Sequence, residues 1–109
     1  MAIEITARHM DGAEAAKAYA QERSGKLVKM FPRIEHVHVI LDMEKHRHKA
    51  EVVVQAKSHV HVEAEESSDD MANSIDVAFE RAEKQLRKVQ EKKQDHRVKP
   101  GEIVEKADS

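Results

Sequence analysis

Apolar positions recur along the chain with two different periods, and each period predicts one kind of element. A period of two is typical of a half-buried β-strand, and a period of three to four is typical of an amphipathic helix. The period of two covers residues 3–7, 37–43, 50–56 and 60–64. The helical period covers residues 11–30 and then runs from Met71 to about Asp95. Pro32 disfavours helical backbone at Phe31 and so ends the first helix, and residues 67–70 offer N-cap side chains for the second.

The order of these elements predicts the architecture. The elements follow one another as β-α-β-β-β-α. Short breaks at residues 44–48 and 57–58 make the last three strands a meander, and the first helix is long enough to cross over between parallel strands. Each strand has one apolar face, so both helices must cover that same face of the sheet. We therefore expect an α/β two-layer sandwich, with two helices packed on one face of a four-stranded mixed sheet.

Length and composition point to one small domain. The chain has 109 residues, 39% of them apolar and only 3% aromatic. We expect an α/β domain over residues 1–95 and a flexible tail over residues 96–109, because the tail contains Pro100-Gly101 and few apolar residues. The chain has no cysteine, which excludes disulfides and thiolate metal sites. No apolar run is long enough to span a membrane, and the first residues do not resemble a signal peptide. We expect a cytoplasmic protein that is a monomer in its free form.

The sequence lacks the motifs that catalysis requires. Its three glycines are too scattered for a phosphate-binding loop or a dinucleotide fingerprint, and none of them frames a serine nucleophile. No set of motifs brings together a nucleophile, a base and an orienting group. We predict that the protein is not an enzyme and that it has no cofactor, metal ion or small-molecule substrate.

The net charge of −2 hides a segregated charge distribution. On a helical wheel, the second helix carries a basic arc and an acidic arc beside its apolar stripe. The basic arc consists of Arg81, Lys84, Lys88 and Lys92, and the acidic arc consists of Asp76, Glu80, Glu83 and Glu91. One interpretation is a surface that binds a polyanion, driven by counterion release. The other is a solvated helix face stabilised by pairs such as Glu80–Lys84.

The first helix adds a second basic set. This set consists of Lys17, Arg23, Lys26 and Lys29, with Arg33 just beyond the helix. Because both helices cover the same face of the sheet, the two basic sets could merge into one surface. No aromatic residue lies among the basic positions, which favours recognition of structured RNA through its backbone and shape over stacking on single strands.

Eight histidines are a clear excess for a chain of this length. Four of them, at positions 36, 38, 59 and 61, fall on the outward face of their strands. In the predicted meander the central strand separates the first pair from the second by roughly 10 Å, which is too far for the two pairs to share one ion. We therefore interpret these histidines as part of an exposed polar face that gains positive charge below about pH 6.5.

A series of short motifs extends over residues 1–95. They are Lys26-Leu27, Phe31 with Arg33-Ile34, Val37-x-Val39-x-Leu41-x-x-Glu44-Lys45, His48-x-Ala50-Glu51-Val52, Asp70-Met71-x-x-x-Ile75-Asp76 and Gln85-Leu86-x-Lys88. In order and spacing, these motifs resemble the short-form ribosome hibernation-promoting factors, the ribosome-associated inhibitor family of bacteria and plastids. The resemblance implies the same β-α-β-β-β-α fold and no catalysis.

The resemblance also implies a partner and a binding surface. The expected partners are the rRNA of the small ribosomal subunit and the intact ribosome. The protein would bind between the head and the body of the subunit, where mRNA and tRNA lie, and silence translation in stationary phase or stress. The rRNA contacts implied by the motifs are Arg23 and Lys26 in the first helix and Arg81, Lys84, Lys88 and Lys92 in the second. The charge pattern adds Lys29 to this set.

Two other functions stay open at the level of sequence. One is a general module for double-stranded RNA, whose α-β-β-β-α order lacks the first strand. The other is a histidine-based module for binding metal or protein, which would use the exposed face of the sheet and not the helices.

Overall fold

The elements of the structure follow the predicted order. The computed structural model describes residues 2–10 and 13–98, and the side chains of these residues as far as Gln90. The elements are β1 (Ala2–Arg8), α1 (Glu14–Met30), β2 (Ile34–Glu44), β3 (Arg47–Ala56), β4 (Val60–Ser68) and α2 (Met71–Val98). Helix α2 ends slightly beyond the predicted Asp95, since its sequence contains no glycine or proline. The prediction that a flexible tail begins at residue 96 is wrong for residues 96–98, which continue α2. The rest of the predicted tail, residues 99–109, lies outside the described residues.

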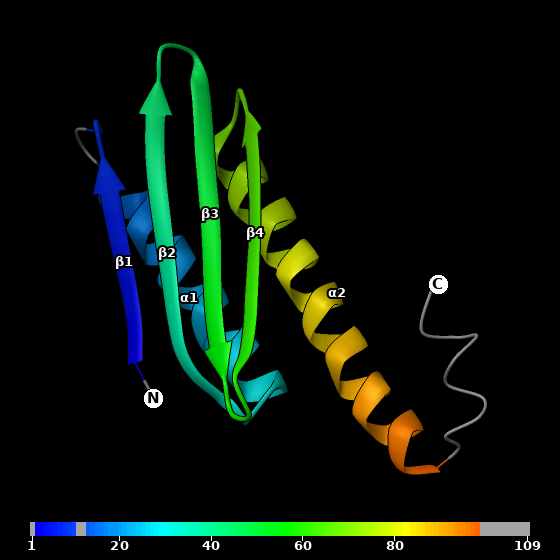
Figure 1. The fold of residues 1–109 in the computed structure, drawn as a ribbon. Helices are drawn as coiled ribbons and strands as arrows, with labels where there is room; N and C mark the ends of the chain where they lie inside the picture. Colours follow the sequence, from blue (N-terminus) through cyan, green and yellow to red (C-terminus); the bar gives the residue numbers. More distant parts are fainter. Residues whose placement is uncertain (1, 11–12, 99–109) are drawn as a thin grey trace.

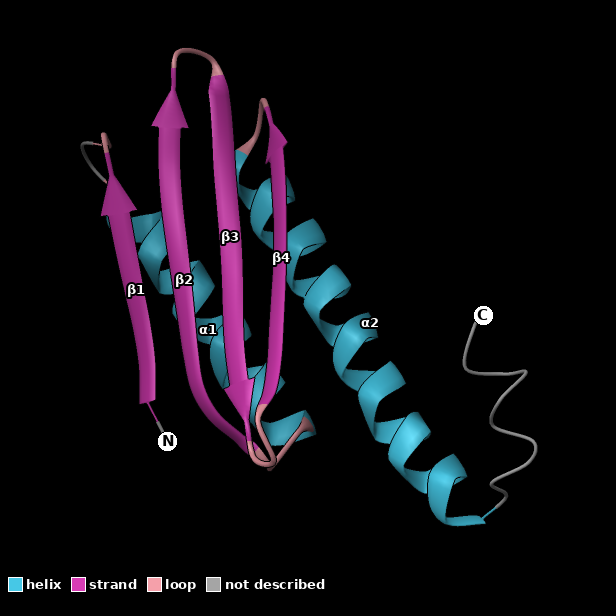
Figure 2. Ribbon diagram, viewed as in Figure 1, coloured by secondary structure: helices cyan, strands magenta, loops and turns pink. Residues whose placement is uncertain are grey.

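The four strands form one mixed sheet in the order β1-β2-β3-β4. Strand β1 runs parallel to β2 over its whole length, from Ala2 opposite His36 to Arg8 opposite Asp42. The other neighbours are antiparallel, and both helices lie on one face of the sheet (Figures 1 and 2). The predicted α/β two-layer sandwich is confirmed.

Alternation along the strands separates a covered face from an open face. On β2 and β3, Val37, Val39, Leu41, Val52 and Val54 point toward the helices and are completely buried. Ile34 is also buried, although it lies an odd number of positions from Val37. The register of β2 against β3 shifts between Ile34 and His36, and this bulge turns Ile34 back toward the core.

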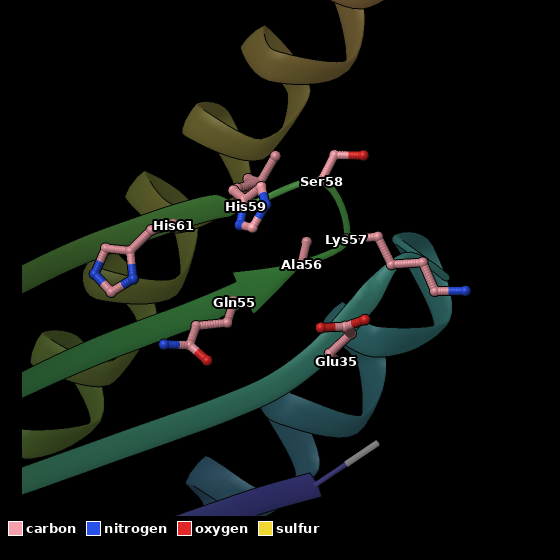
Figure 3. Close-up of a pocket in the computed structure, with 8 residues that line it drawn as sticks. Glu35, Gln55, Ala56, Lys57, Ser58, His59 and His61 are labelled. Atoms are coloured by element: carbon pink, nitrogen blue, oxygen red, sulfur yellow. The ribbon is translucent and has the colours of Figure 1, made fainter.

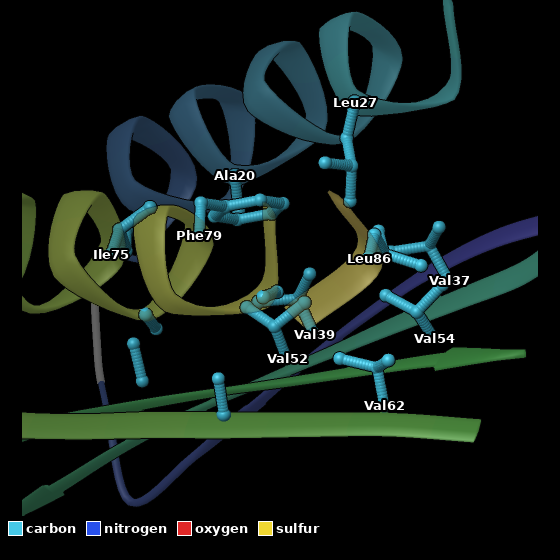
Figure 4. Packing of buried hydrophobic residues seen from close by; sticks show 14 of the residues in the cluster. Ala20, Leu27, Val37, Val39, Val52, Val54, Val62, Ile75, Phe79 and Leu86 are labelled. Atoms are coloured by element: carbon cyan, nitrogen blue, oxygen red, sulfur yellow. The ribbon is translucent and has the colours of Figure 1, made fainter. Parts of the chain in front are cut away.

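Helix α2 supplies the larger share of the helical core. Its buried apolar stripe consists of Met71, Ile75, Ala78, Phe79, Ala82 and Leu86 (Figure 4). Asp70 caps the helix, because the backbone N–H of Asn73 donates to its carboxylate at 3.2 Å. The Ser74 hydroxyl donates to the His48 carbonyl at 2.6 Å and so ties the first turn to β3.

Helix α1 approaches the core with small side chains. Its buried residues are Ala20, Ser24 and Leu27. The Ser24 hydroxyl donates to the carbonyl of Ala20 at 2.8 Å, which satisfies a buried polar group within the helix. In the described part of the chain, neither helix is apolar enough over a sufficient length to cross a membrane.

Candidate nucleic-acid interface

Asp76, the first residue of the acidic arc of α2, contacts α1. The Tyr19 hydroxyl donates a hydrogen bond to the carboxylate of Asp76, and Arg23 Nη1 lies 3.7 Å from Asp76 Oδ1. The guanidinium of Arg23 also lies 5.5 Å from the ring centroid of Phe79, within range of a cation–π interaction. The hydrogen bond to Asp76, together with burial, raises the pKa of Tyr19 above its usual value. These contacts join α1 to α2.

A shallow groove between the helices continues this contact. Arg23, Lys26 and Met30 line it from α1, and Phe79 and Glu83 line it from α2. Glu83 pairs with Arg87 on its own helix at 2.5 Å. Acidic side chains of α2 therefore lie between the two basic sets, which do not join into one uninterrupted basic surface.

The basic arc of α2 begins on the opposite side of the helix, over β4. Arg81 Nη1 donates to the carbonyl of Glu65 at 2.7 Å and lies 2.8 Å from Glu66 Oε1. Gln85 Nε2 donates to the carbonyl of Glu63 at 2.9 Å. Arg81 is still half-exposed, so its guanidinium is tethered at the edge of the sheet and remains accessible to solvent.

Lys84 and Lys88 have a different environment from Arg81. Both are exposed. Among the side chains described, as far as Gln90, neither lysine lies within ion-pair distance of an acidic group. The Glu80–Lys84 pair considered as a helix-stabilising contact is therefore not formed. Lys92 belongs to the described backbone of α2, but its side chain lies outside the described part.

The basic residues of α1 fall into two groups. Arg23 is largely engaged by Asp76 and Phe79, and its side chain is only 25% exposed. Lys26 and Lys29 are exposed, and Lys26 makes a loose pair with Glu22 at 4.0 Å on its own helix. Lys26 and Lys29 can therefore meet an external anion, whereas Arg23 mainly joins α1 to α2.

The outward histidines lie on the open face, as predicted, but one of them is in a turn. His36 and His38 belong to β2, and His61 belongs to β4, with β3 between the two strands. His59 precedes β4 and has a positive φ of 61°. His59 and His61 line a polar hollow of about 490 Å³ at the β3–β4 turn, together with Glu35 and Gln55 (Figure 3). The predicted separation of the two histidine pairs is confirmed.

One neighbour of these histidines was missed by the sequence analysis. Glu4 on β1 lies beside His36 and His38, and one potential ligand atom from each residue lies within 4.8 Å of the other two. The contact depends on β1 pairing with β2, which joins residues more than thirty positions apart. The only sequence signal was that Glu4 has the outward parity of its predicted strand.

Comparisons with known proteins agree with the fold. A family model described as sigma 54 modulation protein / S30EA ribosomal protein matches residues 3–94. A solved structure titled as a ribosomal subunit interface protein from Coxiella burnetii matches with a TM-score of 0.74 and 22% identity, covering 83% of this chain and 98% of that chain. The N-terminal domain of Protein Y from Thermus thermophilus matches with a TM-score of 0.68 and 25% identity, covering 79% of this chain and 96% of that chain. No curated protein sequence matches this chain significantly. The family match confirms the resemblance inferred from the short motifs.

Proposed function

We propose that this chain, which belongs to the sigma 54 modulation protein / S30EA ribosomal protein family, is a ribosome-binding inhibitor of translation and not an enzyme. It would occupy the mRNA and tRNA channel of the small subunit through the basic faces of its helices, during stationary phase or stress. The observation that carries this proposal is the family match, which spans residues 3–94. The partners would be small-subunit rRNA and the intact ribosome, and the protein would act in the cytoplasm.

The charge environments rank the proposed rRNA contacts. A phosphate that approaches Arg23 must compete with Asp76, and one that approaches Arg81 must compete with Glu66. Lys84 and Lys88 have no such competitor among the described side chains, so a phosphate that approaches them displaces none of the described carboxylates. We therefore assign the largest contributions to Lys84, Lys88 and Lys29, because Lys29 is also exposed and has no ion-pair partner among the described side chains. Smaller contributions come from Arg23, Lys26 and Arg81, each of which has an acidic partner. Lys92 is a further proposed contact, which the charge environments do not rank.

The first strand supports this proposal over a general double-stranded-RNA module. Such a module has the order α-β-β-β-α and lacks a strand before its first helix. In this chain β1 pairs with β2 along its whole length and contributes Ile3 and Ile5 to the edge of the core. The two functions also differ in their binding partner, because a hibernation factor should bind the assembled subunit more tightly than a free RNA duplex.

The first test is sedimentation with purified small subunits, large subunits and intact ribosomes over a series of salt concentrations. We expect the protein to sediment with the small subunit and the intact ribosome, and binding to weaken as salt rises, because each phosphate contact releases counterions. Binding that is independent of both subunit and salt would contradict the proposal, and so would an equal affinity for a free RNA duplex.

The second test removes Lys84 and Lys88, which have no ion-pair partner among the described side chains. The double substitution Lys84→Glu with Lys88→Glu should abolish binding at physiological salt, because it replaces two attractions to phosphate with repulsions. Losing two phosphate contacts should also reduce the slope of log affinity against log salt by about 1.4–1.8. Both positions are exposed, so the circular dichroism spectrum should not change.

The matched control carries the same change of charge in the two turns that flank β3. Lys45→Glu with Lys57→Glu alters two exposed lysines that are not on the helices, one in each turn, and neither has an ion-pair partner among the described side chains. This variant should bind ribosomes like the unmodified chain. If it lost binding while the α2 variant kept it, the proposed binding face would be wrong.

A further inference from the structure

Three potential metal ligands meet at one point on the open face of the sheet. His36 and His38 occupy alternate positions on β2, and Glu4 lies opposite His38 on β1. Glu4 Oε1 lies 3.9 Å from His36 Nε2, and the two imidazole rings stand edge to face with their centroids 6.3 Å apart. Within the described residues, this is the one group of three histidine or carboxylate side chains whose potential ligand atoms all lie within 4.8 Å of one another.

The arrangement is close to the one that a bound ion needs. A metal ion bonds imidazole nitrogen and carboxylate oxygen at about 2.0–2.2 Å, so two ligand atoms of one ion stand no more than about 4 Å apart. The donor atoms of the cluster must therefore approach one another by roughly 1 Å from their separation of up to 4.8 Å. The Glu4 side chain is 60% exposed, so rotation about its single bonds can bring its carboxylate closer to both histidines.

The two histidine rings are more constrained than Glu4. Both histidines are partly buried on the sheet surface. The Thr6 hydroxyl oxygen lies 3.0 Å from His38 Nε2 and so helps to hold that ring beside β1. A metal-binding histidine is commonly oriented by a hydrogen bond that its other ring nitrogen donates to a neighbouring group. With Nε2 of His38 donating to Thr6, Nδ1 is the nitrogen left to bind an ion. The protein therefore holds the ring of His38 beside β1, with the ring of His36 next to it and the more exposed carboxylate of Glu4 able to move toward both.

We propose that Glu4, His36 and His38 form a binding site for a borderline divalent transition-metal ion such as Zn²⁺. Two imidazoles and one carboxylate suit this class of ion, whereas Ca²⁺ and Mg²⁺ prefer sites made of oxygen ligands. Three protein ligands leave a coordination position for water on the exposed side. The ion would join the edge strand β1 to β2.

This site is separate from the proposed ribosome-binding surface. The helices lie on the opposite face of the sheet from the cluster (Figure 1). A metal ion bound by the cluster therefore does not meet Lys84 or Lys88. The proposal does not rest on the proposed function, and its test does not use ribosomes, so either proposal can fail alone.

The same face provides a control for metal binding by any exposed histidine. His61 Nε2 lies 2.8 Å from Glu63 Oε2, and this exposed pair on β4 has no second histidine among its described neighbours within the metal-cluster distance. If any exposed histidine beside a carboxylate were enough, removing His61 would weaken zinc binding as much as removing His36. If three ligands are required, only changes in the cluster will matter.

The experiment is isothermal titration of the full chain, purified without an affinity tag, with Zn²⁺ and separately with Mg²⁺. We expect one Zn²⁺ per chain and no measurable binding of Mg²⁺. The variants Glu4→Gln and His36→Ala should each bind Zn²⁺ at least about tenfold more weakly, whereas His61→Ala should bind like the unmodified chain. Circular dichroism of each metal-free variant verifies that it is folded.

Thermal unfolding gives a second readout. Because an ion that binds only the folded state stabilises it, Zn²⁺ should raise the thermal midpoint of the unmodified chain, and a chelator should reverse the rise. Glu4→Gln should reduce this rise, and His61→Ala should not. The proposal is overturned if no stoichiometric binding is detected, or if the cluster variants and His61→Ala bind Zn²⁺ equally well.

Discussion

The two faces of the sheet arise from the same strands but have different chemistry. Toward the helices, β3 presents Val52 and Val54, both completely buried. On the other face the same strand presents Glu51, Val53 and Gln55, none of them fully buried. Because side chains alternate along a strand, one sequence pattern builds a stabilising face and an exposed face at once.

The charges sharpen this contrast. Beyond the covered face, the outer surfaces of the helices carry the lysines proposed to bind phosphate. Among the described strands, the open face carries six acidic side chains, at positions 4, 42, 44, 51, 63 and 65, and three arginine or lysine side chains, at positions 8, 47 and 49. A net charge near zero thus conceals two sides of the molecule on which acidic and basic side chains are distributed differently.

The largest effect on stability should come from the covered face, and adjacent residues on β3 test this. Val52→Thr places a hydroxyl in the apolar core in place of a methyl group, and we expect it to lower the free energy of unfolding by about 2 kcal/mol. Val53→Thr makes the same change on the open face and should cost less than about 0.5 kcal/mol. Urea denaturation followed by circular dichroism measures both values. Equal losses would show that the open face is also part of the core.

Most of the fold was predictable because its signals are local. The period of two located all the strands, and the helical stripe from Met71 to Leu86 located the core face of α2. Asp70 was among the predicted capping residues, since capping depends on positions close in sequence. The bulge near Ile34 was not predicted, because it is defined by the register of β2 against β3.

The candidate sites were less predictable because their partners are distant in sequence. The helical wheel placed Asp76 on an acidic arc, but it did not indicate that Tyr19 and Arg23 on α1 bind it. In the same way, periodicity placed Glu4 on an exposed face without showing that β1 brings it to the histidines of β2. Charge segregation is local and was found, whereas the pairing of Arg23 with Asp76 joins two helices and was not.

A smaller effect on the free energy of unfolding is expected at the contact between α1 and α2. Tyr19→Phe removes the hydrogen bond to Asp76 and should lower the free energy of unfolding by about 1 kcal/mol at pH 7. The pKa of Tyr19 is raised in the folded state, chiefly by that hydrogen bond. The stabilisation by the Tyr19 hydroxyl is therefore fully present below the pKa of tyrosine in the unfolded chain, about 10. It is lost as the pH rises through the pKa of Tyr19 in the folded state.

Urea denaturation of both chains between pH 7 and pH 11 would test this contact between the helices. The difference in stability between the unmodified chain and Tyr19→Phe should shrink as the pH increases. If the difference stayed constant, the hydrogen bond that the Tyr19 hydroxyl donates to Asp76 would not contribute to stability. Lys29→Met, which changes an exposed position on the same helix, should show no comparable dependence on pH in this comparison.

The smallest effect is expected on the open face, at Asp42. A hydrogen bond with His9, whose Nδ1 lies 2.9 Å from Asp42 Oδ1, is the main cause that lowers the pKa of this carboxyl. A lowered pKa contributes stability that is present above the unfolded value of about 3.9 and is lost as the pH falls through the folded pKa. Asp42→Asn should therefore have a slightly lower thermal midpoint than the unmodified chain at pH 5, and the two midpoints should converge near pH 2.

The size of this change tests the contrast between the faces. His9 is 75% exposed, and solvent weakens an ion pair in such a position. If Asp42→Asn destabilised the chain as much as Val52→Thr, the polar open face would contribute to stability like the apolar core. If the change is small, as we expect, the charged side chains of the open face contribute little to folding and remain available to bind a ligand such as a metal ion.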